Sequence, residues 1–152
     1  MIELHDYSYG DEYAVFKLVE HVLTEYGLSV NPDVTDSDLL DIRKSYIATG
    51  GTFRVIRFGG KIVGSYGVYA TSAWLCELRK MYLLPEFRGQ GLGKKLMDDA
   101  IKKAKALGFA EMFLETNSCL QEAVHLYRRY GFTEFEPEHL SDRCDLAMKI
   151  TL

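Results

Sequence analysis

Two periodicities in the hydrophobic residues divide this chain into strands and helices. A period of two, with β-branched and aromatic residues, is typical of a strand, and a period near 3.6 is typical of an amphipathic helix. The first pattern predicts strands over residues 2–8, 53–58, 62–70, 74–84, 111–116, 132–135 and 145–150. The second predicts helices over residues 11–27, 35–48, 91–108 and 120–131.

Short signals between these runs indicate how the elements connect. Asp11 can begin the first helix and Gly27 can end it, while Thr35 and Asp38 loosely resemble a capping box for the second. The hairpin signal Gly59-Gly60-Lys61 joins two antiparallel strands. A strand–helix–strand crossover follows, which we expect to be parallel and right-handed. The expected fold class is α+β (mixed α/β), with a mixed sheet.

Length and composition suit a single domain. The chain has 152 residues, of which 47% are hydrophobic, and no Pro- or Ser-rich linker divides it. A chain of this size can bury a continuous core. We therefore expect one domain over residues 1–152.

Charge and cysteine usage narrow the class of protein. The formal net charge is −4 and the pI is about 5.6, so no global positive field favours nucleic acid as a partner. Cys76, Cys119 and Cys144 lack metal-ligand spacing and leave an odd thiol, which fits a reducing compartment and predicts no metal site. The sequence has neither a leader pattern nor an apolar run of about 18 residues. The expected location is cytoplasmic, without a membrane partner.

A glycine-rich turn is the first candidate for a binding site. Gly89, Gly91 and Gly93 stand between an extended run and an amphipathic one. Glycine lets backbone N–H groups approach a ligand, and the first amides of a helix are unpaired and electropositive, so a phosphate group suits this turn. The spacing matches neither a Walker loop nor the dinucleotide motif G-x-G-x-x-G. What remains is Arg-x-x-Gly-x-Gly, a pattern that a turn without a ligand can also have.

Two motifs in this order resemble the GNAT superfamily of N-acetyltransferases. They are residues 83–93, LLPEFRGQGLG, and residues 123–132, AVHLYRRYGF. The resemblance covers nearly the whole chain and is strongest from Glu77 to Phe132. It implies a three-layer fold, with a mixed, mostly antiparallel sheet of about six to seven strands flanked by about four helices.

The resemblance also implies that acetyl-coenzyme A, as cosubstrate, lies between diverging strands. A bulged or splayed strand leaves backbone groups unpaired, and the amide-bearing pantetheine arm can pair with them as an added strand would. The pyrophosphate would lie on the amides of the glycine turn. The expected coenzyme-binding residues are Met81, Tyr82, Leu83, Arg88, Gly89, Gln90, Gly91, Leu92, Gly93, Lys94, Asn117 and Tyr127.

The implied reaction is direct attack of an amine on the thioester in a ternary complex. Tyr127 is implied as the acid that protonates the departing thiolate, although a tyrosine also suits the apolar face of a helix. Glu77 is implied as the general base, acting directly or through water. Its alternative is a solvated carboxylate, or one paired with Arg79 or Lys80. The amide of Leu83 is implied to stabilise the developing oxyanion.

Weaker candidates and one departure from the family pattern complete the site. Glu115 is a second candidate base, and Cys119 could form an acetyl-enzyme if the helix N-terminus lowered its pKa. Many family members have an asparagine seven residues before the tyrosine, where this chain has Leu120. A coenzyme hydrogen bond is therefore absent or comes from Asn117, which is otherwise a turn-forming residue.

The acceptor is the least defined part of the interpretation. Family members differ mainly in the first two helices and their loop, where Tyr26, Asn31 and Asp33 could touch an acceptor or simply be solvated. The expected acceptor is a primary amine of a small molecule, peptide or protein, and the resemblance leaves room for a homodimer. The alternative function is a non-catalytic acyl-coenzyme A binding or sensing module, because backbone amides alone can hold the coenzyme.

Overall fold

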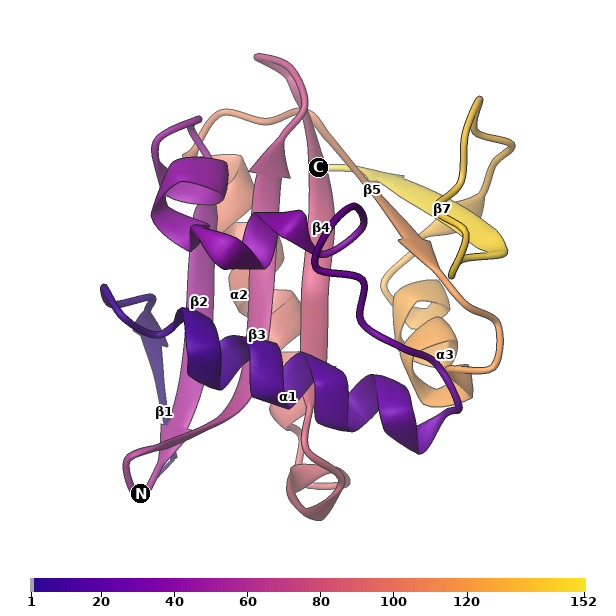
Figure 1. Cartoon of the computed structure of the whole chain (residues 1–152). Coiled ribbons are helices and arrows are strands. Elements are labelled where there is room, and N and C mark those ends of the chain that lie inside the picture. Colours follow the sequence, from indigo (N-terminus) through magenta and orange to yellow (C-terminus); the bar gives the residue numbers. More distant parts are fainter. Residues whose placement is uncertain (1) are drawn as a thin grey trace.

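A sheet of seven strands, counted over the described residues, forms the middle layer of the molecule (Figure 1). The structure is a computed structural model that describes residues 2–152. The strands are β1 (Ile2–Asp6), β2 (Thr52–Phe58), β3 (Lys61–Ala70), β4 (Leu75–Leu83), β5 (Glu111–Thr116), β6 (Thr133–Glu134) and β7 (Leu146–Thr151). Their order is β1-β2-β3-β4-β5-β7-β6, and only the β4–β5 pair of this sheet is parallel.

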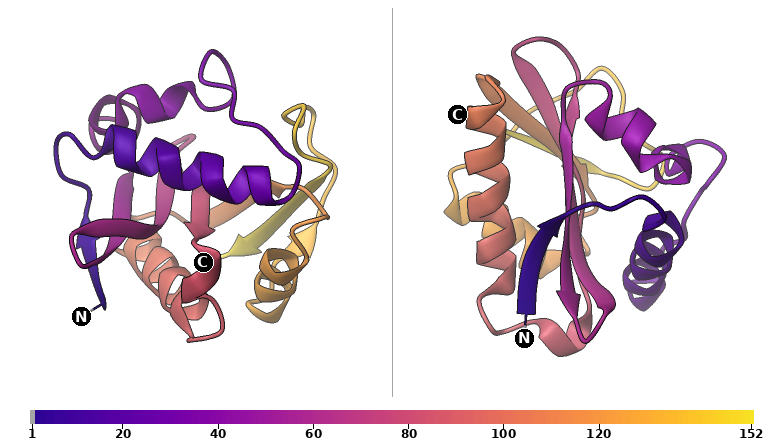
Figure 2. Two further views of the ribbon diagram at one scale, coloured as in Figure 1. Left: turned by 60° about the horizontal axis from the view of Figure 1, so that its bottom comes forward. Right: turned by 90° about the vertical axis from the view of Figure 1, so that its left-hand side faces the viewer.

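Helices cover both faces of the sheet (Figure 2). One face carries α1 (Glu12–Glu25), η1 (Ser37–Leu40) and η2 (Arg43–Ile47). The other carries α2 (Leu92–Ala106) and α3 (Gln121–Arg129), while η3 (Pro85–Phe87) leads from β4 into α2. This arrangement confirms the predicted fold class and the parallel crossover through α2. None of the described helices has the length and hydrophobicity needed to cross a membrane.

The predicted helix over residues 35–48 is wrong as a single α-helix. η1 is a 3-10 helix, η2 is a π-helix, and Asp41 between them is extended, with φ −149° and ψ 89°. Asp38, expected to help cap this helix, is instead buried against the ammonium group of Lys80. Leaving one partner of a buried ion pair alone costs about 3–5 kcal/mol, which exceeds what a regular helix of this length would contribute.

Tyr46 of η2 packs closely on the sheet and thereby positions the η1–η2 segment. Its ring lies edge-on to those of Phe53 and Tyr69, with centroids 5.0 and 5.8 Å away. Gly67 makes this approach feasible, because a Cβ atom there would lie 2.6 Å from Cε1 of Tyr46. The hydroxyl group of Tyr46 donates a hydrogen bond to Asp38. Packing therefore brings the acidic segment before η2 onto the sheet.

Candidate active site

The parallel strands β4 and β5 separate along their length and open a cleft. They pair from Leu75–Glu111 to Glu77–Phe113, and both strands continue beyond this point. A cleft of about 1220 Å³ lies between the diverging ends and reaches α1, α2 and α3. Figure 1 shows β5 and β7 slanting away from β4. The resemblance to the GNAT superfamily implies a coenzyme between diverging strands, and for this cleft that stays a prediction.

A β-bulge in β4 determines which groups face this cleft. The register of β3 and β4 shifts between Ser65 and Gly67. Across the shift, two residues of β4, Lys80 and Met81, stand opposite one residue of β3. Lys80 has φ 54°, which makes it the only non-glycine residue with positive φ in the described part of the chain. The bulge turns its side chain to the face that Arg79 also occupies.

Beyond the bulge, the backbone of β4 turns polar groups toward the cleft. Leu84 donates its amide to the carbonyl oxygen of Val63 on β3, at 2.9 Å. Since amides of consecutive strand residues point to opposite sides, the amide of Leu83 points away from β3 and toward the gap beside β5. Met81, Tyr82 and Leu83 all line the cleft, and their contact with a pantetheine arm stays a prediction.

The glycine turn forms another wall of the cleft. Gly89 and Gly91 have φ of 75° and 80°, in the left-handed region that favours glycine. A Cβ atom added at either position would meet no described atom within 4 Å, so the turn borders open space. Gly91 is the N-cap of α2 and provides no side chain to satisfy the first helical amides. These groups fit an anionic ligand such as a pyrophosphate.

Three predicted coenzyme residues have side chains that are engaged within the protein. Arg88 contacts the carboxylate of Glu25 at 2.7 Å and donates to the carbonyl oxygen of Leu83 at 2.8 Å, so it ties the end of α1 to the end of β4. Gln90 donates to a backbone carbonyl at 3.3 Å, and Leu92 is buried in the core. For these three residues, the prediction of coenzyme binding therefore concerns the backbone amides and not the side chains.

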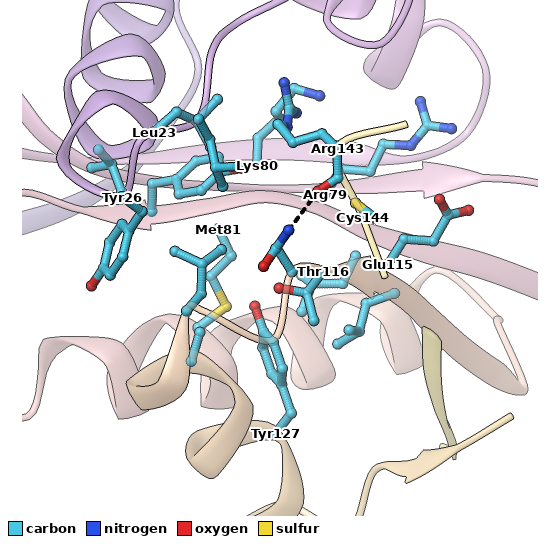
Figure 3. Close-up of a pocket in the computed structure, with 18 of the residues that line it drawn as sticks. Leu23, Tyr26, Arg79, Lys80, Met81, Glu115, Thr116, Tyr127, Arg143 and Cys144 are labelled. Atoms are coloured by element: carbon cyan, nitrogen blue, oxygen red, sulfur yellow. Dashed lines mark hydrogen bonds between the residues drawn. The ribbon is translucent and has the colours of Figure 1, made fainter. Parts of the chain in front are cut away.

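Tyr127 enters the cleft from α3. Its ring packs edge-to-face on Phe132, with centroids 5.8 Å apart, which restrains its orientation. Figure 3 shows its hydroxyl group pointing into the pocket, with Met81 and Thr116 nearby. Burial raises the pKa of Tyr127, with a smaller contribution from Tyr82. The phenol is therefore protonated at neutral pH, as a proton donor must be.

Glu77 lies where β4 and β5 separate. Its Oε1 atom accepts a hydrogen bond of 2.6 Å from Nε of Arg79, and the residue is only 9% exposed. Burial raises the pKa of Glu77, while the charge and hydrogen bond of Arg79 act in the opposite direction and Glu115 adds to the rise. A carboxylate with a raised pKa is a better proton acceptor than an ordinary one. Glu77 is thus both paired with Arg79 and suited to act as a base.

A buried ionic cluster that the sequence analysis did not predict occupies the α1 side of the cleft. Asp36 is fully buried, with Oδ1 3.0 Å from Nζ of Lys80. Arg143 donates to both carboxylate oxygens of Asp36, at 2.7 and 2.9 Å. Asp38 Oδ1 lies 3.3 Å from the same Lys80 ammonium group, without hydrogen-bond geometry. The α1 side of the cleft therefore depends on charges from separate parts of the chain.

The ionic cluster joins two loops across the cleft. Arg143, in the loop before β7, also donates to the carbonyl oxygen of Ser29, in the loop after α1, at 3.1 Å. Burial alone raises the pKa of Asp36, but the hydrogen bond from Arg143 and the charge of Lys80 outweigh it and lower the pKa to about 2. One sequence signal for this cluster is the position of Lys80 in its strand. If side chains alternated strictly between the two faces of β4, Lys80 would lie on the same face as the buried residues Cys76 and Leu78, where a charge needs a partner.

The remaining predicted polar residues stabilise turns near the cleft. Asn117 donates to the carbonyl oxygen of Arg143 and accepts from the amide of Cys119, both at 2.9 Å. Its assignment as a coenzyme ligand stays a prediction. Glu115 accepts from the amide and hydroxyl group of Ser141 at 2.9 and 3.0 Å. Within residues 2–152, His, Cys, Asp and Glu side chains form no cluster suited to a metal ion.

Comparisons with known proteins agree with this geometry. The sequence profile of the acetyltransferase (GNAT) family matches residues 14–132. The uncharacterized N-acetyltransferase YjgM of Escherichia coli is 35% identical over 131 residues, which cover 83% of this chain and 78% of that protein.

Solved structures share the fold at lower sequence identity. A GNAT-family acetyltransferase from Staphylococcus aureus has a TM-score of 0.92 at 22% identity, covering 99% of both chains. A GNAT-family acetyltransferase from Elizabethkingia anophelis, solved with acetyl-CoA bound, has a TM-score of 0.68 at 20% identity, covering 99% of this chain and 98% of that one. The profile match and the E. coli relative show the family as well as the fold, and this chain belongs to the GNAT family of acetyltransferases.

Proposed function

We propose that this protein is an N-acetyltransferase that transfers the acetyl group of acetyl-CoA to a primary amine of a small molecule or peptide, by direct attack in a ternary complex. One observation carries this proposal. A single cleft combines the open glycine turn, the outward-facing amide of Leu83 and the hydroxyl group of Tyr127. When bound, the coenzyme supplies an acetyl group activated as a thioester.

Backbone groups would hold the coenzyme. The amides from Gly89 to Lys94 would receive the pyrophosphate, a role supported by the open space beside the turn and by the helix that begins there. The backbone from Met81 to Leu83 would pair with the pantetheine arm on the edge that β5 leaves open. The GNAT-family structure from Elizabethkingia anophelis contains acetyl-CoA, which supports the same ligand for this fold.

Three groups of the protein would carry the chemistry. Glu77 accepts a proton from the amine, which makes the nitrogen nucleophilic. The amide of Leu83 donates to the carbonyl oxygen on which negative charge develops. Tyr127 donates its proton to the sulfur as the C–N bond forms and the C–S bond breaks. The nitrogen loses two protons overall: one goes to Glu77 and from there to solvent, and the other replaces the proton that Tyr127 gave to the sulfur, so that the phenol is restored.

The release of free thiol from acetyl-CoA in the presence of a panel of amines tests the proposal. We expect Tyr127→Phe to lower kcat about 100-fold, because the departing thiolate then lacks its acid. Tyr130→Phe is the matched control, since its hydroxyl group bonds to Asp98 at 2.5 Å and to the Lys94 carbonyl oxygen at 3.1 Å. It should stay within about twofold of wild type.

Two results would change this picture. A wild-type rate in Tyr127→Phe would remove Tyr127 from the mechanism. Calorimetry that shows tight acetyl-CoA binding, while no amine of the panel is acetylated, would favour a non-catalytic acyl-CoA binding module.

A further inference from the structure

Three cationic side chains line the side of the cleft next to α1 and the loop before β7, and two of them are paired with buried protein carboxylates. Lys80 lies between Asp36 and Asp38, and Arg143 makes a bidentate pair with Asp36. An anionic ligand would have to compete with these buried carboxylates for either cation. Arg79 differs from both.

Two contacts hold Arg79 in place and leave its outer edge free. Its Nε donates to Glu77 at 2.6 Å, and its guanidinium carbon lies 3.8 Å from the centroid of the Tyr69 ring. Within the described residues, Nη1 and Nη2 make no hydrogen bond, and the side chain is 29% exposed. A guanidinium fixed by one edge and one face presents its remaining N–H donors in a defined direction. Arg79 is therefore a preorganised anion-binding group.

Glu77 also keeps one carboxylate oxygen available. Its hydrogen bond to Arg79 uses Oε1 alone. Glu115, on the neighbouring strand, accepts both of its hydrogen bonds from Ser141 on Oε1 and has no contact with Arg79 among the described hydrogen bonds. Because Glu77 and Arg79 are two residues apart on β4, their side chains lie on the same face of the sheet. The cleft thus offers one negative and one positive group in direct contact.

We propose that the acceptor is a free α-amino acid, whose ammonium group faces Glu77 and whose carboxylate lies on the outer edge of Arg79. This inference rests on the proposed acetyltransferase function. An α-amino acid carries both charges on one carbon atom, so its spacing suits two protein groups that touch each other. A plain amine would leave the Arg79 edge unpaired, and a peptide N-terminus would offer it an uncharged amide in place of a carboxylate.

Matched acceptors test the inference on the wild-type protein. L-leucine is compared with 3-methylbutylamine and leucinamide, and L-phenylalanine with phenethylamine and phenylalaninamide, at saturating acetyl-CoA. Within each set, the acceptors differ only in the group on the carbon atom that carries the amine, which is a carboxylate, a hydrogen atom or a carboxamide. We expect kcat/KM for the amino acid to exceed that for its partners about 10- to 100-fold, as charge-assisted hydrogen bonds to an arginine imply.

Substitution of Arg79 tests whether this side chain causes the preference for amino acids over plain amines. Arg79→Met should reduce the ratio of kcat/KM between leucine and 3-methylbutylamine to about one, and Arg79→Lys should leave an intermediate value. The ratio is the readout because any change in the pKa of Glu77 affects both acceptors alike. Arg128→Met is the control, since Arg128 is exposed on α3 and pairs with Glu134 at 3.3 Å, and it should keep the wild-type ratio.

The outcomes separate the inference from the function on which it rests. Wild-type protein that acetylates plain amines as well as amino acids overturns the inference and leaves the acetyltransferase proposal standing. The same holds if the preference persists in Arg79→Met. Failure to acetylate any member of the panel overturns the acetyltransferase proposal and the inference with it.

Discussion

The two sides of the cleft are built in different ways. The side that we propose for the coenzyme consists of residues from the stretch 81–94, and the groups proposed to hold the ligand there are backbone amides. The side that we propose for the acceptor consists of charged side chains from the loop before η1, from β4 and from the loop before β7. A backbone site depends on conformation and open space, and a side-chain site depends on the partners that neutralise each charge. Substitutions should therefore disrupt the two sides by different mechanisms.

Among substitutions that test this difference, removal of the proposed base should have the largest effect, which is on catalytic rate. We expect Glu77→Gln to lower kcat about 100- to 10,000-fold while acetyl-CoA affinity changes little, because the coenzyme side is unaltered. In wild type, kcat/KM should fall toward acid pH as Glu77 is protonated, with a midpoint above the ordinary carboxyl pKa of 4.5, since burial raises its pKa. Glu115→Gln is the matched control. If Glu115→Gln is the slower variant, the assignment of the base is reversed.

Breaking the ionic cluster should have the next largest effect, on stability. Lys80→Met leaves Asp36 and Asp38 buried without their shared cation, so the free energy of unfolding should drop by about 3–5 kcal/mol. Urea unfolding measures the loss. Lys102→Met, at an exposed position of α2, should change it by less than about 0.5 kcal/mol. Equal stability in the two variants would show that the cluster contributes nothing.

Acid pH should weaken the same cluster by a smaller amount. The folded-state pKa of Asp36 is about 2, below its ordinary value of 3.8, so its contribution is complete above pH 3.8 and is lost as pH falls toward 2. The expected loss is about 2 kcal/mol. Urea unfolding between these pH values measures it, and Asp36→Asn should flatten the dependence. An unchanged pH dependence in Asp36→Asn would assign the loss to other carboxylates.

The smallest effect on stability should come from the glycine turn. Gly91→Ala forces alanine to φ 80° and should cost about 1 kcal/mol. Gly108→Ala, at the opposite end of α2 with φ 94° and equally open surroundings, should cost about the same. Only Gly91→Ala should weaken acetyl-CoA binding in calorimetry, because its Cβ would enter the space proposed for the coenzyme. Equal affinity in both variants would contradict the pyrophosphate site.

The prediction of the fold succeeded where local patterns and packing agree. β5 occupies residues 111–116 as predicted, and α2 buries the apolar stripe that its 3.6-residue period indicates. The prediction failed over residues 35–48, where the apolar spacing resembles a helix but Asp36 and Asp38 are drawn into ion pairs. Local propensity is a weak determinant when buried charges must be neutralised.

The sequence by itself determined the fold class of this protein and the position of its glycine turn, because both depend on short periodic runs and on one contiguous segment. The sequence also indicated the helix that contains Tyr127, because the apolar residues of that helix follow a local period. The pairing of the buried charges on the other side of the cleft followed only from the tertiary structure. Asp36 and Arg143 are 107 residues apart in the chain, and no local pattern links them. Burial alone makes their pairing necessary, and burial is a property of the folded chain.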